Sequence, residues 1–172
     1  SYFLIEDNNQ PINFSVPTGN FGDVYAGYLS KKMGLPINKF IVATNQNDIL
    51  HRAITKGTYY LEKVSETISP SMDIQIASNF ERLIYDLNNF SDTKTIDAMK
   101  DIKEKGKYKI NKDNLDKINY NFLSSRMNHD EVLKTIKSVY DKTNMILDPH
   151  TAIGYGAFDK VNLNGNNIVL AT

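Results

Sequence analysis

The 172-residue sequence contains no cysteine. This absence excludes disulfides, thiolate nucleophiles and cysteine-ligated metals. The sequence also lacks a surplus of charge, because 20 Lys and Arg residues balance 20 Asp and Glu residues. A neutral chain does not favour a broad surface for nucleic acid or for an anionic membrane. We therefore expect neither kind of partner.

Long apolar runs are absent as well. None approaches the roughly 18 residues of a membrane-spanning helix, and the first residues lack the basic and apolar regions of a secretory signal. His51 and His129 have no partner at ligand spacing, so we expect no metal site. The length is sufficient for a hydrophobic core. These features favour a cytoplasmic protein without a membrane anchor.

The two ends of the chain suggest a piece of a longer protein. The sequence does not begin with Met, and it stops inside the apolar run at residues 168–172. Such a run is typical of an interior strand, and domains seldom end within one. We therefore expect further segments on both sides of this chain.

The most informative segment is SVPTGNFGD at residues 15–23. Alternating apolar residues lead into it, a helical pattern leaves it, and two glycines lie where the helix begins. Glycine permits positive φ and a close backbone approach, and a helix N-terminus attracts anions. The loop therefore predicts a phosphate ligand. The alternative is an ordinary strand-to-helix turn in which Asp23 caps the helix.

Two familiar nucleotide motifs are missing from this loop. It lacks the Lys-Ser/Thr ending of a Walker A motif, so the sequence does not support nucleoside triphosphate hydrolysis. It also lacks the G-x-G-x-x-G order of a dinucleotide-binding site.

The first part of the chain has the pattern of a strand–helix–strand unit. We predict a strand at residues 12–17, a helix at 22–33 and a strand at 38–44, with Gly34-Leu35-Pro36 ending the helix. Such units have parallel strands and a right-handed crossover. The predicted fold class is α/β, a parallel twisted sheet flanked by helices, with the glycine loop at the carboxyl edge of the sheet.

The rest of the chain continues this pattern. We predict a short helix after Asn45, a loop at 57–73, a helix beginning at Asn79 and a helix at 91–105 ended by Gly106. Residues 107–127 predict a short helix and a strand. Further expected elements are a helix opened by residues 128–131, a helix after residues 148–152, and a final strand after the turn at 164–167. We expect residues 91–127 to form a peripheral insertion of helices and strand.

Four motifs occur in register along the chain. They are the glycine loop, LP at 35–36 followed by IVATN at 41–45, SPSMDI at 69–74 followed by SNFER at 78–82, and LDPHTAIG at 147–154. This arrangement closely resembles threonine synthase, a pyridoxal-phosphate enzyme of the tryptophan-synthase-β-like fold, known as fold type II. The resemblance implies that residues 1–172 form its carboxyl-terminal, cofactor-phosphate-binding portion.

The resemblance also implies an activity for the complete enzyme. Threonine synthases convert O-phospho-L-homoserine and water to L-threonine and phosphate, and pyridoxal phosphate stores negative charge during the reaction. The family's Schiff-base lysine lies upstream, in a Phe-Lys-Asp type of sequence that does not occur here. We therefore expect this chain to contain no catalytic nucleophile and to be inactive alone. The sequence does not predict an oligomeric state.

The resemblance places Gly19, Asn20, Phe21, Gly22 and Asp23 at the cofactor phosphate. Backbone N–H groups at the helix start would bind the dianion. The Asp23 carboxylate would repel a phosphate that it faced, so we expect it to cap the helix instead.

The resemblance also places Thr151 at the pyridine nitrogen of the cofactor. A hydroxyl, unlike a carboxylate, does not stabilise a protonated pyridine ring by its charge. The alternative is an ordinary Thr at a helix start after Pro149. Asp148 could orient His150, but residues so close in sequence rarely face each other. We therefore expect a structural role for His150.

Two other polar groups invite a functional interpretation. Arg82 could bind an anion, but an ion pair with Glu81 at a helix start is favoured. Asn45, Asn47 and Asp48 follow a predicted parallel strand, and a capping role is sufficient to explain them.

Two further functions remain open at this stage. One is a threonine or serine dehydratase of the same fold, although the Asp-Pro-His-Thr-Ala segment and the composition of the glycine loop argue against it. The other is a non-catalytic module that binds a phosphate ligand, which the missing lysine would allow.

Overall fold

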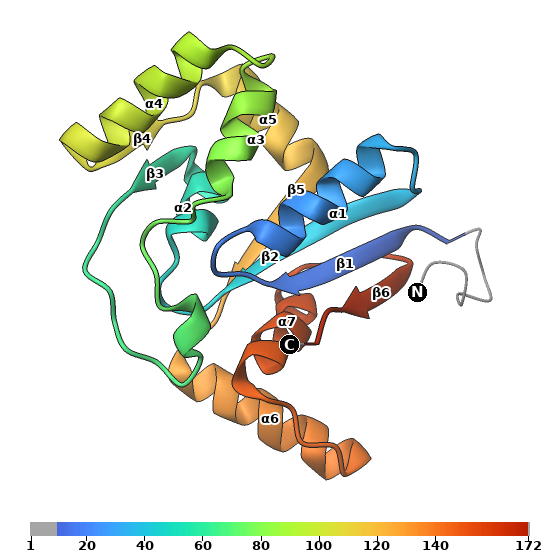
Figure 1. Ribbon diagram of the computed structural model, residues 1–172. Coiled ribbons are helices and arrows are strands. Elements are labelled where there is room, and N and C mark those ends of the chain that lie inside the picture. Colours follow the sequence, from blue (N-terminus) through green and yellow to red (C-terminus); the bar gives the residue numbers. More distant parts are fainter. Residues whose placement is uncertain (1–9, 172) are drawn as a thin grey trace.

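The computed structural model describes residues 10–171. Its centre is a sheet of four parallel strands in the order β5-β2-β1-β6 (Figure 1). These strands are β1 (Ile12–Pro17), β2 (Ile37–Thr44), β5 (Phe122–Arg126) and β6 (Asn166–Val169). The predicted parallel α/β architecture is therefore confirmed.

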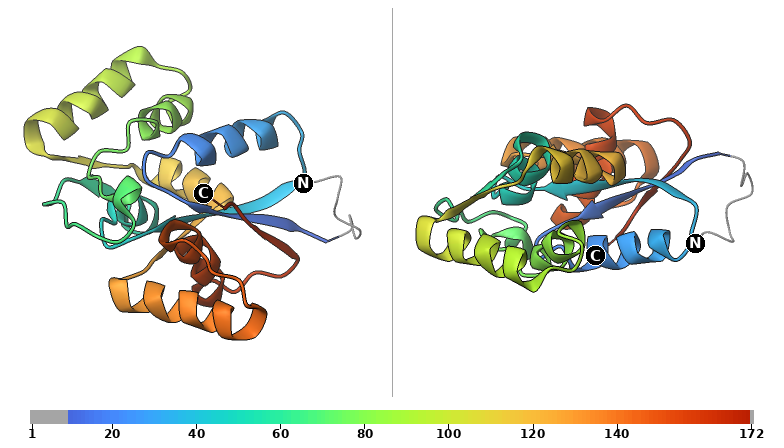
Figure 2. Two further views of the ribbon diagram at one scale, coloured as in Figure 1. Left: turned by 60° about the horizontal axis from the view of Figure 1, so that its bottom comes forward. Right: turned by 90° about the horizontal axis from the view of Figure 1, so that it is seen from above.

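Helices cover both faces of this sheet. In Figures 1 and 2, α1 lies on one side, whereas α7 lies on the other, with α6 packed outside it. No helix within residues 10–171 has the length and apolar character needed to cross a membrane. The helices are α1 (Gly22–Lys32), α2 (Ile49–Lys56), α3 (Phe80–Leu87), α4 (Asp92–Lys105), α5 (Lys112–Asn121), α6 (His129–Thr143) and α7 (Pro149–Lys160).

The central strand β2 explains why the core has two halves. Side chains alternate between the two faces of a strand. Phe40 and Val42 pack into the apolar cluster that includes α1 and α3. Ile41 and Ala43 pack into a second cluster with α7. Because both faces are buried at residues 40–43, this part of β2 has the continuous apolar sequence that is typical of a parallel strand.

The predicted strand–helix–strand unit agrees closely with the structure. β1 has the predicted bounds, α1 ends one residue earlier than predicted, and β2 begins one residue earlier. Gly34 has a φ of 106°, a conformation that a side chain would disfavour. The glycine in the sequence therefore marked the end of α1 correctly, because the chain needs a positive φ at this position.

Two short strands lie outside the main sheet. The predicted loop at 57–73 contains β3 (Thr58–Tyr60) and the 3₁₀ turn Pro70–Met72. β3 pairs antiparallel with β4 (Lys107–Lys109) (Figure 1). Three residues are too few for an alternating pattern to be recognised in a sequence, so the pairing was not predicted.

The segment at 91–127 contributes to two parts of the molecule. Its helix α4 lies away from the main sheet (Figure 1). Its strand β5, in contrast, pairs with β2 in that sheet, and Phe122 is buried in the core. Residues 122–126 therefore differ from the peripheral position expected of the whole segment.

The final strand lies at an edge of the sheet. Within residues 10–171, β6 pairs only with β1, whereas the sequence suggested an interior strand. Thr172, the last residue of the expected strand, lies outside the described residues. Because β2 and β6 flank β1 on opposite sides, the carboxyl end of β1 lies where the strand order reverses. Ligands of open α/β sheets bind at this position.

Candidate phosphate and cofactor site

The glycine-rich loop, residues 18–21, connects β1 to α1. Its first residue is fixed to the sheet, because Thr18 N donates to Ala43 O of β2 at 2.8 Å. Its last residue, Phe21, is the N-cap of α1. The ring of Phe21 is buried, with its centroid 5.3 Å from that of Phe80 and 5.8 Å from that of Phe122. The loop is therefore anchored at both ends.

The left-handed residue of this loop is Phe21, not a glycine. Phe21 has a φ of 67°, whereas neither Gly19 nor Gly22 has a positive φ. The expectation that the two glycines supply this conformation was wrong. A left-handed residue with a side chain costs about 1–2 kcal/mol. Burial of the Phe21 ring offsets this cost, and such local strain is characteristic of binding sites.

Gly19 is required because another segment of the chain approaches it closely. A Cβ on Gly19 would lie 2.6 Å from the carbonyl oxygen of Ser71. At Gly22 the nearest atom to a Cβ would be Asn79 Nδ2, at 3.4 Å, which is ordinary contact. The two glycines therefore serve different purposes, and only the first is enforced by packing.

The backbone N–H groups of residues 19–24 all lack an acceptor within the described part of the chain. The first helical bond of α1 is donated by Tyr25 N to Phe21 O, at 3.0 Å. Phe21 also has no side-chain oxygen that could cap the helix. A run of unpaired N–H groups at a helix start forms an anion-binding site.

The side chain of Asn20 connects the loop to the segment before α3. Its Oδ1 accepts hydrogen bonds from Ser78 N at 2.9 Å and Ser78 Oγ at 3.0 Å. Asn79 N donates to Asn20 O at 3.2 Å. The side-chain oxygen of Asn20 is therefore engaged by Ser78, and it connects the loop to the start of α3.

Asp23 does not cap α1 as the sequence suggested. Phe21 is the N-cap residue, and Asp23 is the second residue of the helix, with an exposed side chain. A carboxylate in the first turn still interacts favourably with the helix dipole. Its role within this protein is therefore electrostatic.

The loop lines a cavity of about 560 Å³ that also reaches the start of α7. The sequence motifs around 15–23, 69–74 and 147–154 meet here, although more than 120 residues separate the first from the last. The lining residues are Pro17, Gly19, Asn20, Asp23, Ser71, Met72, Asp148 and His150.

Asp148 caps α7 with its side chain. Its Oδ1 accepts hydrogen bonds from His150 N at 2.8 Å and Thr151 N at 3.1 Å. Burial raises the pKa of the Asp148 carboxyl, but hydrogen bonds from the side chain and backbone of Thr151 and from His150 outweigh it, so the pKa lies below its ordinary value. Asp148 is therefore ionised at neutral pH. Thr151 itself is buried at the first turn of α7.

Asp148 and His150 do face each other, contrary to the expectation from their spacing. His150 Nδ1 lies 3.2 Å from Asp148 Oδ1. This contact is available because Asp148 is an N-cap residue with extended backbone and precedes the regular helix. His150 Nε2 is buried and has no hydrogen-bond partner within the described residues.

A polar network holds Ser71 and Met72 against the glycine loop. Asn45 Nδ2 donates to Asp73 Oδ1 at 2.7 Å, and Asn47 Nδ2 donates to the same oxygen at 2.9 Å. Asp73 also accepts from Thr67 N at 2.7 Å. These bonds fix the segment after β3 over the carboxyl end of β2. The role of Asn45 and Asn47 is therefore to position this wall of the cavity.

Asp48 is the N-cap residue of α2, but its side chain makes ion pairs and does not cap the helix. Asp48 Oδ1 lies 2.9 Å from Arg52 Nη1, and Oδ2 lies 3.0 Å from Arg126 Nη1. Arg52 also pairs with Glu62. The capping role expected for Asp48 was therefore wrong, because two arginines reach it from α2 and β5.

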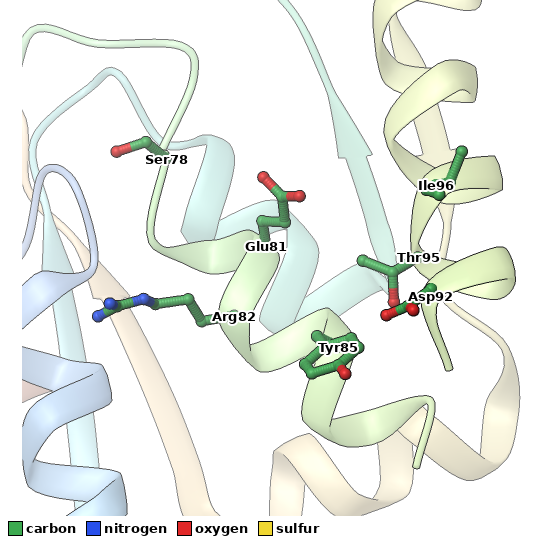
Figure 3. Close-up of a pocket in the computed structure, with 7 residues that line it drawn as sticks. All are labelled: Ser78, Glu81, Arg82, Tyr85, Asp92, Thr95 and Ile96. Carbon is green, nitrogen blue, oxygen red and sulfur yellow. The ribbon is translucent and has the colours of Figure 1, made fainter. Parts of the chain in front are cut away.

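The segment SNFER borders a second cavity, of about 490 Å³, between α3 and α4. Figure 3 shows that Glu81 and Arg82 point away from each other. No ion pair joins them in the part of the chain that the structure describes, so this expectation was wrong. The Arg82 guanidinium instead lies 5.7 Å from the centre of the Tyr25 ring, on α1.

Residues 10–171 contain no group of three or more His, Asp or Glu side chains arranged to hold a metal ion. Sequence reasoning missed Ser71, whose carbonyl excludes a side chain at Gly19, and it considered Asp148 only as a partner of His150, not as the cap of α7. An Asp before Pro at a helix start is a recognisable N-cap signal. The approach of Ser71 to Gly19 has no signal in the sequence.

The chain resembles curated proteins over most of its own length. No protein-family model matches the sequence. The threonine synthase of Pseudomonas aeruginosa is 42% identical over 149 residues, which cover 87% of this chain and 32% of that protein. The threonine synthase of Saccharomyces cerevisiae is 40% identical over 174 residues, which cover 93% of this chain and 34% of that protein. The chain thus spans about one third of the length of these relatives.

Solved structures show the same likeness. The pyridoxal-phosphate-bound threonine synthase of Brucella melitensis matches with a TM-score of 0.93 and 42% identity, over 97% of this chain and 36% of that one. A bacterial threonine deaminase matches with a TM-score of 0.56 at 10% identity, over 94% of this chain and 47% of that one, which shows the fold alone.

The fold is therefore the α/β fold that fold type II pyridoxal-phosphate enzymes share. Within that class, the chain is a homologue of the threonine synthases, matching about one third of their length. The dehydratase alternative is not favoured, because the identity to a threonine deaminase is only 10%.

Proposed function

We propose that this chain forms the cofactor-phosphate-binding part of a threonine synthase. The complete enzyme would convert O-phospho-L-homoserine and water to L-threonine and phosphate, in the cytoplasm and without a nucleic-acid or membrane partner. One observation supports the proposal most directly: the N–H groups of residues 19–24 have no acceptor within the described residues and border a cavity. The similarity to threonine synthases, one of which is bound to pyridoxal phosphate, supports this ligand class.

The residues present fit the phosphate of pyridoxal phosphate. The N–H groups of Gly19, Asn20, Phe21, Gly22 and Asp23 would bind its oxygens at the start of α1. No Lys or Arg lines the cavity within the described part of the chain. The negative charge of the phosphate would therefore be balanced by N–H dipoles and by the dipole of α1. The Asp23 carboxylate would repel a phosphate that it faced, so only the backbone N–H of Asp23 is proposed to contact the phosphate.

Thr151 is proposed to contact the ring nitrogen of the cofactor. It lies one residue after His150, which lines the same cavity, and its backbone is fixed by Asp148. When bound, pyridoxal phosphate would supply an electron sink for the reaction. This chain would supply the phosphate site and the ring-nitrogen contact. The lysine that binds the cofactor would come from a segment outside this sequence, so we expect the chain alone to be inactive.

A reconstitution experiment tests this function. The complete gene product that contains this sequence is expressed, supplied with pyridoxal phosphate and incubated with O-phospho-L-homoserine. Equal amounts of phosphate and L-threonine are expected. Bound cofactor with release of phosphate and a keto acid would instead indicate a dehydratase-like reaction. A gene product that binds no cofactor would contradict the proposed site.

A further inference from the structure

The start of α7 directs several hydrogen bonds to one carboxylate. Asp148 Oδ1 accepts from His150 N and Thr151 N, and His150 Nδ1 lies 3.2 Å away. The Thr151 side chain also makes a hydrogen bond to Asp148. Asp148 is therefore more than a backbone cap, because it determines where the hydroxyl proton of Thr151 points.

The chemistry of these two groups fixes the direction of that bond. An ionised carboxylate can only accept hydrogen bonds, whereas a hydroxyl has one proton to donate and two lone pairs that accept. Since the Thr151 hydroxyl donates its proton to Asp148, its oxygen can meet a further group only as an acceptor. Any ligand atom that contacts this oxygen must then bring a proton of its own.

We infer that Asp148 acts through Thr151 to keep a proton on the ring nitrogen of the bound cofactor. This inference rests on the proposed contact between Thr151 and that nitrogen. The resulting chain runs from the ring N–H to Thr151 Oγ1 and from the Thr151 hydroxyl to Asp148. Asp148 is then a positioning residue, because it contacts Thr151 and not the cofactor. Its negative charge would supply what the hydroxyl alone lacks.

The surroundings of Asp148 favour a carboxylate that is ionised at neutral pH. Hydrogen bonds from Thr151 and His150 keep its pKa low although the group is partly buried. The other titratable side chains that line the cavity are His150 and Asp23. With the carboxylate as its partner, His150 Nδ1 is assigned as the protonated ring nitrogen. The hydrogen bonds from Thr151 and from His150 both favour the ionised form of Asp148.

The test measures the proton directly. The complete gene product is loaded with pyridoxal phosphate carrying ¹⁵N in the ring, and the ¹⁵N chemical shift reports whether that nitrogen is protonated. The wild type is expected to show the protonated shift. Asp148→Asn should move the shift to the unprotonated position. Asn is a good N-cap residue, so the start of α7 should persist in this variant.

Three further variants separate this role from a structural one. Thr151→Val should also give the unprotonated shift, and it serves as the test if Asp148→Asn does not fold. Thr151→Ser, which retains the hydroxyl, should restore the wild-type shift. Glu81→Gln removes a carboxylate that borders the other cavity and should leave the shift unchanged.

The outcomes are distinct. An unprotonated nitrogen in the wild type, or a protonated nitrogen in folded Asp148→Asn, would overturn the inference while leaving the proposed function intact. A wild-type gene product that takes up no labelled cofactor would instead contradict the proposed function itself.

Discussion

At the scale of single residues, the candidate site depends on positions where the chain has no freedom. Gly19 lies against the carbonyl of Ser71, and Phe21 adopts a left-handed conformation while its ring fills the core. Asp48 is buried between two arginines. The contribution of such a position to stability can be measured by substituting the residue.

A Gly19→Ala substitution is expected to destabilise the protein by about 1–3 kcal/mol, because its Cβ would collide with a backbone oxygen. Gly22→Ala is the matched control within the same loop. Its Cβ would meet no atom closer than 3.4 Å, so stability should change little. Urea unfolding followed by circular dichroism measures both. Equal losses would show that the approach of Ser71 does not constrain Gly19.

Asp48→Asn is expected to cost about 1–3 kcal/mol of stability, because the buried Arg52 loses one of its two carboxylate partners and keeps only Glu62. Arg126→Met is the control, since the Arg126 side chain is 51% exposed and surface pairs contribute at most about 1 kcal/mol. Unfolding in urea again provides the measurement. A loss as large for Arg126→Met would show that the pair with Arg52 is not the dominant one.

At the scale of secondary-structure elements, capping interactions determine where the helices begin. α6 has a capping box, in which Asn128 and Glu131 exchange hydrogen bonds between side chain and backbone. Glu131 also binds Lys160, the last residue of α7, at 2.6 Å. The cap of one helix is thus connected to the end of the next.

This connection predicts a pH dependence. The hydrogen bond from Lys160, followed by the bond from Asn128 and nearby positive charges, lowers the pKa of Glu131 against the opposing effect of burial. A depressed pKa stabilises the folded state above the ordinary value for Glu, and this contribution is lost as the pH falls through the folded pKa. Wild type should therefore be more stable than Glu131→Gln at about pH 6, and the difference should shrink as the pH is lowered to about 3.

The comparison can be made by urea unfolding at both pH values. In a Lys160→Met background the advantage of Glu131 at the higher pH should shrink, because its strongest partner is gone. A difference between Glu131 and Gln that is the same at both pH values would exclude this contribution.

At the scale of the whole molecule, one sheet separates two apolar clusters. Leu83 of α3 belongs to the first and Ile153 of α7 to the second, and both are essentially inaccessible to solvent. The shared strand β2 contributes side chains to both clusters. The two halves of the core should therefore unfold together.

Leu83→Ala and Ile153→Ala are each expected to cost about 2–5 kcal/mol. Because the two sites lie in separate clusters, their effects in the double variant should add within about 0.5 kcal/mol. Circular dichroism and tyrosine fluorescence, the natural probe in a chain without Trp, should report one transition. Two separate transitions would show that the halves fold independently.

Local sequence signals predicted much of this fold. The bounds of β1, α1 and β2 followed from apolar periodicity and from Gly34, and Ser91 with Gly106 marked α4. The pairing of β3 with β4 and the approach of Ser71 to Gly19 were not predictable, because they depend on residues distant in sequence. The conformation of Phe21 was also missed, since its cost is offset only by partners on α3 and β5.

The anchoring of Phe21 has a consequence for how this site could change during evolution. The side chain that shapes the glycine loop is in contact with Phe80 and Phe122, which lie in the interior and do not line the cavity. A smaller side chain at either interior position would thus change the support of the loop, and with it ligand affinity, as well as the packing of the core. Such sites would escape any survey restricted to residues that touch the ligand.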